Sequence, residues 1–167
     1  MKKERLPEVQ FLIDELNLTP HVEGGAFRET YRSHHQFHPE GYSGPCAYST
    51  AIYFLLEFGE FSAFHRIKSD EMWHHYLGGT LHIYEINVHG NLIHHKLGKQ
   101  FEKGEQLQVW IPGGSWFASR VEQSGEFVLS GCTVAPGFDF RDFELADRKE
   151  FAEQFPEYRD LIKEMTR

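Results

Sequence analysis

Between residues 49 and 134 the chain is a series of short apolar and aromatic runs, each ended by glycine, proline, asparagine or another turn-forming residue. Many short runs at this spacing are typical of antiparallel β-structure in a sandwich or barrel. Two tripeptides, HGN and PGG, are predicted hairpin turns, because glycine and asparagine tolerate positive φ. The predicted strands are 49–57, 61–67, 71–77, 80–88, 92–97, 106–111, 115–121 and 126–134.

Helical periodicity is confined to the two ends of the chain. Residues 5–16 repeat apolar side chains at helical spacing, and Pro7 suits a first helical turn, where its missing N–H is not needed. Residues 146–155 and 156–167 indicate two short helices divided at Pro156, with charged exposed faces. We therefore predict a β-domain with a helix before it and short helices after it.

The segments between these regions carry weaker signals. Residues 26–33, AFRETYRS, alternate, which places Arg28 and Arg32 on one face of a predicted strand. The preceding pair, Gly24 and Gly25, marks a bend or a close backbone approach. Residues 34–48 mix histidine, glycine and proline without periodicity and are predicted to be a loop. APGFDF, at 135–140, is interpreted as a turn that docks the terminal helices.

Length, charge and cysteine content narrow the class of protein. With 167 residues, the chain suits a single domain spanning 1–167. Its net charge is −8 without a basic run, which argues against a nucleic-acid partner, and no apolar run approaches a membrane span. The cysteines, Cys46 and Cys132, are too few for a disulfide framework, and no apolar stretch follows the charged start. We expect a cytoplasmic protein whose cysteines are thiols.

Titratable side chains are concentrated in residues 59–79, GEFSAFHRIKSDEMWHHYLGG. On a β-strand every second side chain shares a face, so an inward His65 implies an inward Ala63 and Ile67. If Glu71 of the next strand also points inward, so do Trp73 and His75. His65, Glu71 and His75 would then meet inside the barrel, with Trp73 as an aromatic wall.

The spacing of this stretch resembles the first motif of the cupin superfamily. That motif reads G, five residues, H, one residue, H, three or four residues, E, six residues, G, and here it runs from Gly59 to Gly78 through His65, Ile67 and Glu71. PGGSWF, at 112–117, is similar to the second motif, which reads P, any residue, G, two residues, H.

Four longer blocks resemble one group of cupins, the DUF985 (cupin_5) family. They are HVEGGAFRETYRS at 21–33, SAFHRIKSDEMWHHYLGG at 62–79, VWIPGGSWFAS at 109–119 and GCTVAPGFDFRDFELA at 131–146. The resemblance implies a mainly β, double-stranded antiparallel β-helix barrel, or jelly roll. It also implies a pocket inside the barrel and a homodimer. It implies no particular reaction, because the family has no settled activity.

The chain departs from the cupin pattern at two metal-ligand positions. Metal-binding cupins use three histidines and one glutamate, but Ile67 and Phe117 stand in two of those places, and neither side chain has a lone pair to donate. We therefore expect no metal and no other cofactor. The fallback ligand set is His65, Glu71 and His75, which would form a two-histidine, one-carboxylate site.

Three functions remain open on the sequence alone. The favoured one is a metal-independent isomerase or epimerase acting on a sugar, nucleotide-sugar or similar polar metabolite, with His65 and Glu71 as catalytic residues. The alternative is a non-catalytic small-molecule binding protein, and a metal-dependent oxygenase is less favoured. The residues predicted to contact the ligand are Ala63, Ile67, Trp73, His75, Phe117 and Arg28.

Overall fold

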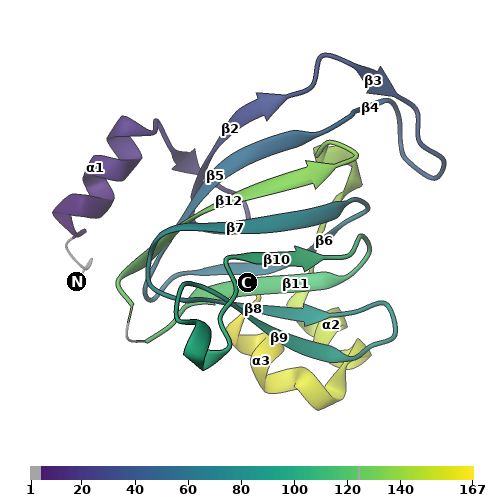
Figure 1. Ribbon diagram of the computed structural model, residues 1–167. Helices are drawn as coiled ribbons and strands as arrows, with labels where there is room; N and C mark the ends of the chain where they lie inside the picture. The colour runs from purple at the N-terminus through teal and green to yellow at the C-terminus, as the bar shows by residue number, and fades with distance from the viewer. Residues whose placement is uncertain (1–4, 124) are drawn as a thin grey trace.

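The computed structural model describes residues 5–123 and 125–167, which fold into two facing antiparallel β-sheets with helices at both ends of the chain (Figure 1). Within these residues the first sheet has six strands in the order β1-β2-β5-β12-β7-β10, and the second has five in the order β13-β6-β11-β8-β9. A separate pair, β3 and β4, projects from the first sheet.

The elements have the following bounds. The first sheet comprises β1 (Thr19–Pro20), β2 (Ala26–Arg32), β5 (Thr50–Glu57), β12 (Phe127–Ala135), β7 (Asp70–Gly78) and β10 (Gln108–Ile111). The second sheet comprises β13 (Phe143–Leu145), β6 (Phe61–Ile67), β11 (Trp116–Val121), β8 (Leu81–Ile86) and β9 (Leu92–Leu97). The remaining elements are α1 (Pro7–Glu15), β3 (Gln36–Phe37), β4 (Cys46–Ala47), η1 (Phe101–Lys103), η2 (Phe140–Asp142), α2 (Arg148–Gln154), η3 (Pro156–Tyr158) and α3 (Arg159–Glu164).

The main hydrophobic core lies between the two sheets. Alternate side chains of each strand point inward and interdigitate, as in β-sandwiches generally. Trp73 of the first sheet packs edge-on against Phe54 and Phe117, with ring centroids 5.6 and 6.3 Å apart. These three side chains are at most 1% exposed. They fill the interior next to the cavity described below, so that cavity has a rigid apolar boundary.

The helices cover apolar surface that the sheets leave outside. Phe64 of β6 and Trp116 of β11 point away from the main core and contact Phe151 of α2, with ring centroids 5.3 and 4.8 Å away. Figure 1 shows α2 and α3 together against the second sheet. At the opposite side of the molecule α1 buries Val9 and Leu12 in a separate cluster with residues of β5 and β12.

The predicted architecture is confirmed, including the helix before the barrel and the two helices divided at Pro156. Each predicted strand from 49–57 to 126–134 is present, with ends that differ by at most two residues. The prediction of a loop at 34–48 was wrong in part, because β3 and β4 pair there. The strand β13 was also missed, since its three residues are too few to show a period.

None of the helices in residues 5–123 and 125–167 has both the length and the apolar character needed to cross a membrane. Cys46 and Cys132 are free thiols, and both are buried.

Candidate functional site

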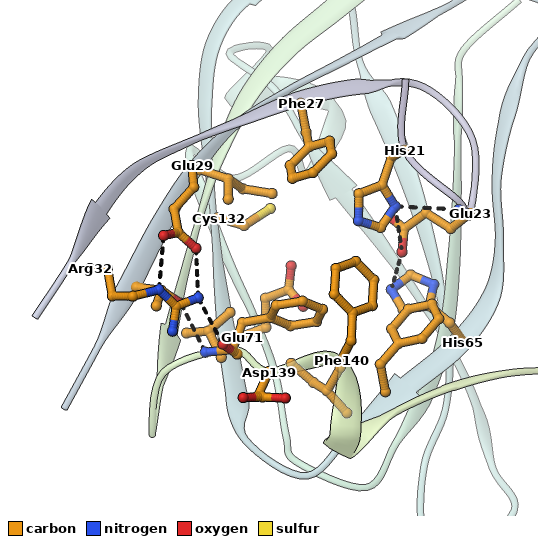
Figure 2. A pocket seen from close by; sticks show the side chains of 16 residues that line it. His21, Glu23, Phe27, Glu29, Arg32, His65, Glu71, Cys132, Asp139 and Phe140 are labelled. Atoms are coloured by element: carbon orange, nitrogen blue, oxygen red, sulfur yellow. Dashed lines mark hydrogen bonds and ion pairs between the residues drawn. The ribbon is translucent and has the colours of Figure 1, made fainter. Parts of the chain in front are cut away.

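A cavity of about 280 Å3 opens at one end of the space between the sheets (Figure 2). Its volume is close to the lower end of the range for small-molecule sites, roughly 300–1,000 Å3. Side chains from β2, β5, β7 and β12 of the first sheet face β6 of the second sheet across it. The loop between β1 and β2 and the residues 138–143 complete its walls. We call residues 138–143 the aromatic segment, because Phe138, Phe140 and Phe143 all line the cavity.

A buried imidazole–carboxyl contact forms one wall of the cavity. His65 Nε2 lies 3.0 Å from Glu23 Oε2, and the two residues are 3% and 6% exposed. His65 Nδ1 donates to the carbonyl oxygen of Ala63 at 2.7 Å, which assigns that nitrogen its proton. The contact between Nε2 and Glu23 therefore holds one shared proton. Ser62 Oγ donates to the other oxygen of Glu23 at 3.0 Å.

Burial shifts both members of this contact toward their neutral forms. It raises the pKa of Glu23, against opposing effects of His21, Ser62 and Arg167. It lowers the pKa of His65, against opposing effects of Glu71 and the Ala63 carbonyl. In these neutral forms the Glu23 hydroxyl donates its proton to Nε2 of His65.

Two glycines allow Glu23 to reach this position. Gly24 and Gly25 have φ of 117° and 74°, values that favour glycine. A Cβ on Gly24 would lie 2.2 Å from the carbonyl oxygen of Phe61. The loop is thus pressed against β6, where Ala63 N donates to the carbonyl oxygen of Glu23 at 2.8 Å. The close backbone approach predicted for these glycines is confirmed.

His21 lies beside Glu23 on the same wall. Its Nδ1 accepts the backbone N–H of Glu23 at 3.3 Å and lies 3.5 Å from Glu23 Oε2. Burial lowers the pKa of His21 and so favours its neutral form. Because Nδ1 accepts a hydrogen bond, the proton of the neutral ring is on Nε2. In Figure 2 that nitrogen is on the cavity side of the ring.

Glu71 of β7 projects from the facing sheet. Burial raises its pKa to about 7, partly offset by His65. The thiol of Cys132, on the neighbouring strand β12, lines the cavity beside this carboxyl group and partly offsets the effect of burial on its pKa. Burial and the adjacent Glu71 raise the pKa of Cys132 well above its ordinary value, so Cys132 stays a thiol. A carboxyl group with a pKa near 7 can accept or donate a proton at neutral pH.

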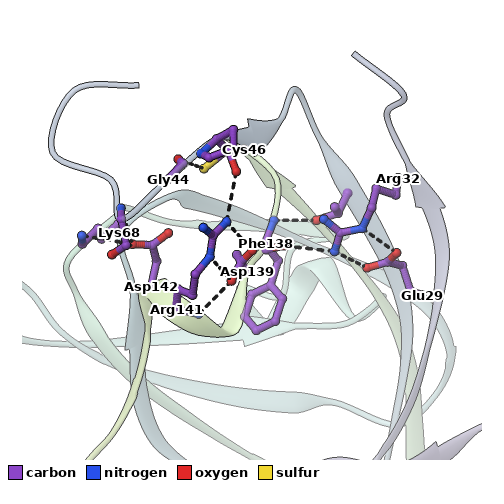
Figure 3. Close-up of polar contacts among 12 residues, drawn as sticks. Glu29, Arg32, Gly44, Cys46, Lys68, Phe138, Asp139, Arg141 and Asp142 are labelled. Atoms are coloured by element: carbon purple, nitrogen blue, oxygen red, sulfur yellow. Dashed lines mark hydrogen bonds and ion pairs between the residues drawn. The ribbon is translucent and has the colours of Figure 1, made fainter. Parts of the chain in front are cut away.

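The aromatic segment is held over the cavity by polar contacts at its margins (Figure 3). Arg32 Nη2 donates to the carbonyl oxygen of Phe138 at 3.1 Å, while Phe138 N donates to Thr50 Oγ1 at 2.9 Å. Asp142, at the other end, accepts from Lys68 Nζ at 3.0 Å. The interpretation of APGFDF as a turn that docks the terminal helices did not place this segment at the cavity, which its two phenylalanines line.

The prediction that Arg28 faces the pocket was wrong. A β-bulge interrupts the register of β2 with β5 between Glu29 and Tyr31, which places Arg28 and Arg32 on opposite faces. The Arg28 guanidinium lies over the ring of Tyr53, 5.8 Å from its centroid, outside the barrel. Arg32 lines the cavity and forms a bidentate ion pair with Glu29, at 2.9 and 2.7 Å.

His75 is not near Glu71. It lies four residues farther along β7, which at about 3.3 Å per residue separates the two Cα atoms by about 13 Å. Its Nε2 donates to the carbonyl oxygen of Gly79 at 2.8 Å, at the far end of the strand. Strand alternation predicts the face of a side chain but does not place it at the depth of the site, so the predicted contribution of His75 was wrong.

The other predicted contacts separate into two groups. His65, Ile67 and Glu71 all line the cavity. Trp73 and Phe117 belong to the buried core and stand behind the cavity wall, although the Phe117 ring lies 4.2 Å from that of His65. Ala63 is likewise buried behind the wall and acts through its backbone, which contacts His65 and Glu23 as described.

Several cavity residues were not predicted from the sequence, among them His21, Glu23 and the aromatic segment. The sequence held one signal for Glu23, which directly precedes Gly24 and Gly25. Paired glycines mark a place where the backbone closely approaches another segment, and a carboxylate there is brought close to that segment. The phenylalanines gave no such signal, since aromatic residues in a β-protein are ordinarily core residues.

The side chains at this site do not suit the metal of metal-binding cupins. Ile67 lines the cavity and Phe117 packs against His65, at the two positions where those proteins have histidine. In the part of the chain that the structure describes, no cluster of three or more histidine, cysteine, aspartate or glutamate side chains is arranged to hold a metal ion.

Comparison with known families agrees with the fold and with the quoted sequence blocks. The model of the cupin superfamily family Cupin_5 (DUF985) matches residues 10–146. The chain belongs to this family. It is 33% identical over 147 residues to the uncharacterized protein YML079W of Saccharomyces cerevisiae, with 80% of this chain and 73% of that protein covered.

Two solved structures of similar proteins share the complete fold. Protein SO0799 of Shewanella oneidensis is 39% identical, with a TM-score of 0.87, and the match covers 95% of this chain and 96% of that one. A hypothetical protein from Leishmania major is 34% identical, with a TM-score of 0.88 and coverage of 94% and 97%.

More distant cupins share the fold alone. A dTDP sugar isomerase of Desulfovibrio desulfuricans matches at 14% identity with a TM-score of 0.54, covering 78% of this chain and 88% of that one. An oxalate decarboxylase of Lactobacillus farciminis matches at 12% identity with a TM-score of 0.56, and the match covers 89% of this chain and 41% of that one. Because these two enzymes catalyse different reactions, the fold does not select the chemistry, and the site must supply that argument.

We predict that Glu71→Gln stabilises the protein increasingly as the pH rises. Burial raises the pKa of Glu71 from 4.5 in the unfolded chain to about 7 in the folded protein. The folded state therefore binds this proton more tightly than the unfolded state does, and the resulting stabilisation is complete below pH 4.5 and is lost as the pH rises through 7. At about 1.4 kcal/mol per unit, the free energy of unfolding of the variant relative to wild type should increase by about 2–3 kcal/mol between pH 5 and pH 8.

Urea unfolding at both pH values measures this difference. Glu102→Gln, at an exposed glutamate on η1, is the matched control and should show little pH-dependent gain. A gain for Glu71→Gln that is equal at the two pH values would contradict the proposed titration of Glu71.

Proposed function

We propose that this protein is a metal-independent enzyme of the isomerase or epimerase type, which moves a proton on a small polar metabolite bound in the cavity. One observation carries the proposal. Titratable groups with shifted pKa values stand on different walls of the cavity, with Glu71, whose pKa is about 7, on one wall and the buried His65–Glu23 contact on another. Strongly shifted titratable groups in a pocket are typical of catalytic sites.

This arrangement supports a proton transfer between two faces of a substrate. In the proposed mechanism the ionised form of Glu71 removes a proton from a carbon next to a carbonyl group. The proton shared by Glu23 and Nε2 of His65 is returned to that carbon from the opposite wall, which leaves this contact one proton short and Glu71 protonated until both exchange protons with solvent. The Nδ1 bond of His65 to the Ala63 carbonyl holds the imidazole in position. Such positioned acids and bases contribute typically 10²- to 10⁴-fold to a rate.

The size of the cavity supports a substrate comparable to a single sugar ring. A volume of about 280 Å3 is small for a nucleotide-sugar, so of the substrates predicted from the sequence we favour a sugar or a polar metabolite of similar size. A fold shared with a dTDP sugar isomerase is compatible with this proposal but does not carry it.

We predict that the protein catalyses exchange of carbon-bound hydrogen with solvent deuterium in a panel of small aldoses, ketoses and amino sugars. His65→Ala and Glu71→Gln should each reduce the exchange rate at least 100-fold, because each removes a proton-transfer group. Proton NMR in D2O measures the exchange, and the unchanged far-ultraviolet circular dichroism of both variants verifies their folding.

Glu102→Gln serves again as the control that retains exchange. A ligand that binds in the cavity without any exchange in wild-type protein would instead identify a non-catalytic binding protein. Exchange that is unchanged in both variants would remove His65 and Glu71 from the proposed mechanism.

We predict that the purified protein carries no stoichiometric transition metal in the barrel. Ile67 and Phe117 supply no donor atoms, and His75 is at the far end of β7, so His65 and Glu71 are the cupin ligands that remain. Two protein ligands replace little of the hydration that a divalent ion loses on entering an apolar cavity. Elemental analysis of untagged protein, purified without chelator, tests this. About one zinc, iron or manganese per chain that disappears in His65→Ala would contradict it.

We also propose that the protein is a cytoplasmic homodimer, and that the outer face of the first sheet is covered by a second copy. Tyr31, Tyr76 and Trp110 are 55%, 48% and 53% exposed there. Exposed aromatic surface of this kind marks contact regions. Light scattering should give twice the monomer mass of 19.5 kDa, and Trp110→Glu should shift it toward the monomer. Phe101→Glu, at an exposed phenylalanine of η1, should not. A monomeric wild-type mass would contradict the proposal.

A further inference from the structure

Two of the carboxyl groups that line the cavity are neutralised, because Glu29 pairs with Arg32 and Asp139 pairs with Arg141, whereas Glu23 and Glu71 have no lysine or arginine ion pair among the described residues. The cavity is lined by the carboxyl groups of Glu23, Glu29, Glu71 and Asp139, and Arg32 is the lysine or arginine side chain among its described lining residues. The guanidinium of Arg32 is already occupied, since it is paired with both oxygens of Glu29 and with the Phe138 carbonyl.

The two innermost carboxyl groups lack a strong cationic partner. Glu71 faces His65, Glu23 and Cys132, and burial raises its pKa to about 7. Glu23 faces His21 and His65, and Arg167 reaches it only weakly from behind the wall. Because the pKa values of both histidines are lowered by burial, they do not supply the missing positive charge. A cation in the cavity would let these carboxyl groups ionise.

Aromatic rings complete the enclosure around this acidic interior. The rings of Phe138 and Phe140 lie 4.9 Å apart at 81°, and those of Phe140 and Phe143 lie 5.7 Å apart at 71°. Phe27 and His21 continue the enclosure from the other side, 4.5 Å apart at 86°. Figure 2 shows Phe27 and Phe140 on opposite sides of the open space. Rings at steep angles to one another, with carboxyl groups among them, form the type of cage that binds quaternary ammonium groups.

Phe140 is the most accessible of these rings. It is 56% exposed although it belongs to the cavity wall, which leaves its surface available at the entrance. An organic cation entering the cavity would meet this ring before it reaches Glu71.

From this arrangement we propose that the cavity recognises a small organic cation, that is, a metabolite with an amine or quaternary ammonium group enclosed by the phenylalanines and facing Glu71 and Glu23. This inference rests on the proposed function, since it names the chemical class of the ligand for the same site. An anionic ligand such as a sugar phosphate would face Glu23 and Glu71 without a free cation to offset them, because Arg32 and Arg141 are already paired with Glu29 and Asp139.

Three probes of similar shape separate charge from size. Choline carries a cationic trimethylammonium head, 3,3-dimethyl-1-butanol is its neutral isostere, and 3,3-dimethylbutanoate carries an anionic group. We expect isothermal titration calorimetry of the full chain to show choline binding at least 10-fold more tightly than the alcohol, with the anion binding most weakly. Both the attraction of a cation to the aromatic faces and its attraction to the carboxyl groups favour choline over the neutral alcohol.

The pH dependence of choline binding provides a second readout. If ionised Glu71 faces the cation, choline affinity should rise about 10-fold from pH 6 to pH 8, because a carboxyl group with a pKa of about 7 is mainly protonated at the lower value. Titrations in buffers of different ionisation enthalpy should show release of a proton on binding near pH 6. Glu71→Gln should remove both effects.

Phe140→Leu tests the aromatic contribution, and its exposed position makes misfolding a minor concern. The variant should lose roughly 3- to 10-fold in choline affinity and less in affinity for the alcohol, since leucine keeps the apolar contact but not the ring. Phe101→Leu, the same change at an exposed ring outside the cavity, should leave both affinities unchanged.

Equal binding of choline and the alcohol, or tighter binding of the anion, would overturn the cation proposal and leave the cavity as a binding site for another class of molecule. Failure of all three probes to bind at millimolar concentration would also overturn it. The deuterium-exchange measurement decides the proposed proton transfer separately, because it does not depend on these probes.

Discussion

The contact between Glu23 and His65 connects the parts of the chain on which the cavity depends. It joins the loop between β1 and β2 to strand β6, and so bridges the first sheet to the second. Backbone bonds accompany it, from Ala63 N to the Glu23 carbonyl and from His65 Nδ1 to the Ala63 carbonyl. Replacing either side chain with an apolar one would leave buried polar groups unpaired, at a cost of about 1–3 kcal/mol each. The Glu23–His65 pair therefore both stabilises the fold at the cavity and supplies a proton-transfer group in the proposed mechanism.

Burial without neutralising charge is the second feature that organises the site. A carboxyl group removed from water is driven toward its neutral form unless a cation or several hydrogen bonds compensate for the lost hydration. Glu71 has the imidazole of His65 and the thiol of Cys132 for partial compensation, and its pKa remains about 7. The fold thus maintains a group that exchanges protons at neutral pH, which is the requirement of the proposed enzyme. The same shortage of positive charge is the reason that an organic cation suits the cavity.

The two apolar substitutions in the cupin motif have a consequence beyond the loss of metal ligands. Ile67 forms part of the cavity wall, and Phe117 packs against the His65 ring. These contacts occupy space where the metal-binding relatives have donor atoms. They leave Nε2 of His65 directed at Glu23, a residue outside the cupin motif. The imidazole is thereby held by a carboxyl group of the protein in the position where it would otherwise ligate a metal.

The sequence by itself determined the longer strands, the helices, the family and the inward direction of His65, Ile67 and Glu71, but not the short strands β3, β4 and β13. These features depend on local periodicity and spacing, which a linear chain displays directly. Only the tertiary structure decided the rest. The bulge in β2 turns Arg32 toward the cavity and leaves Arg28 on the outer face. His75 is too far along β7 from Glu71 to reach the site. The pairing of Glu23 with His65 and the position of the aromatic segment depend on segments far apart in the chain, whose contacts are set by sheet register and loop packing. No local pattern encodes those contacts, because the physical interaction that selects them exists only after the two sheets have come together.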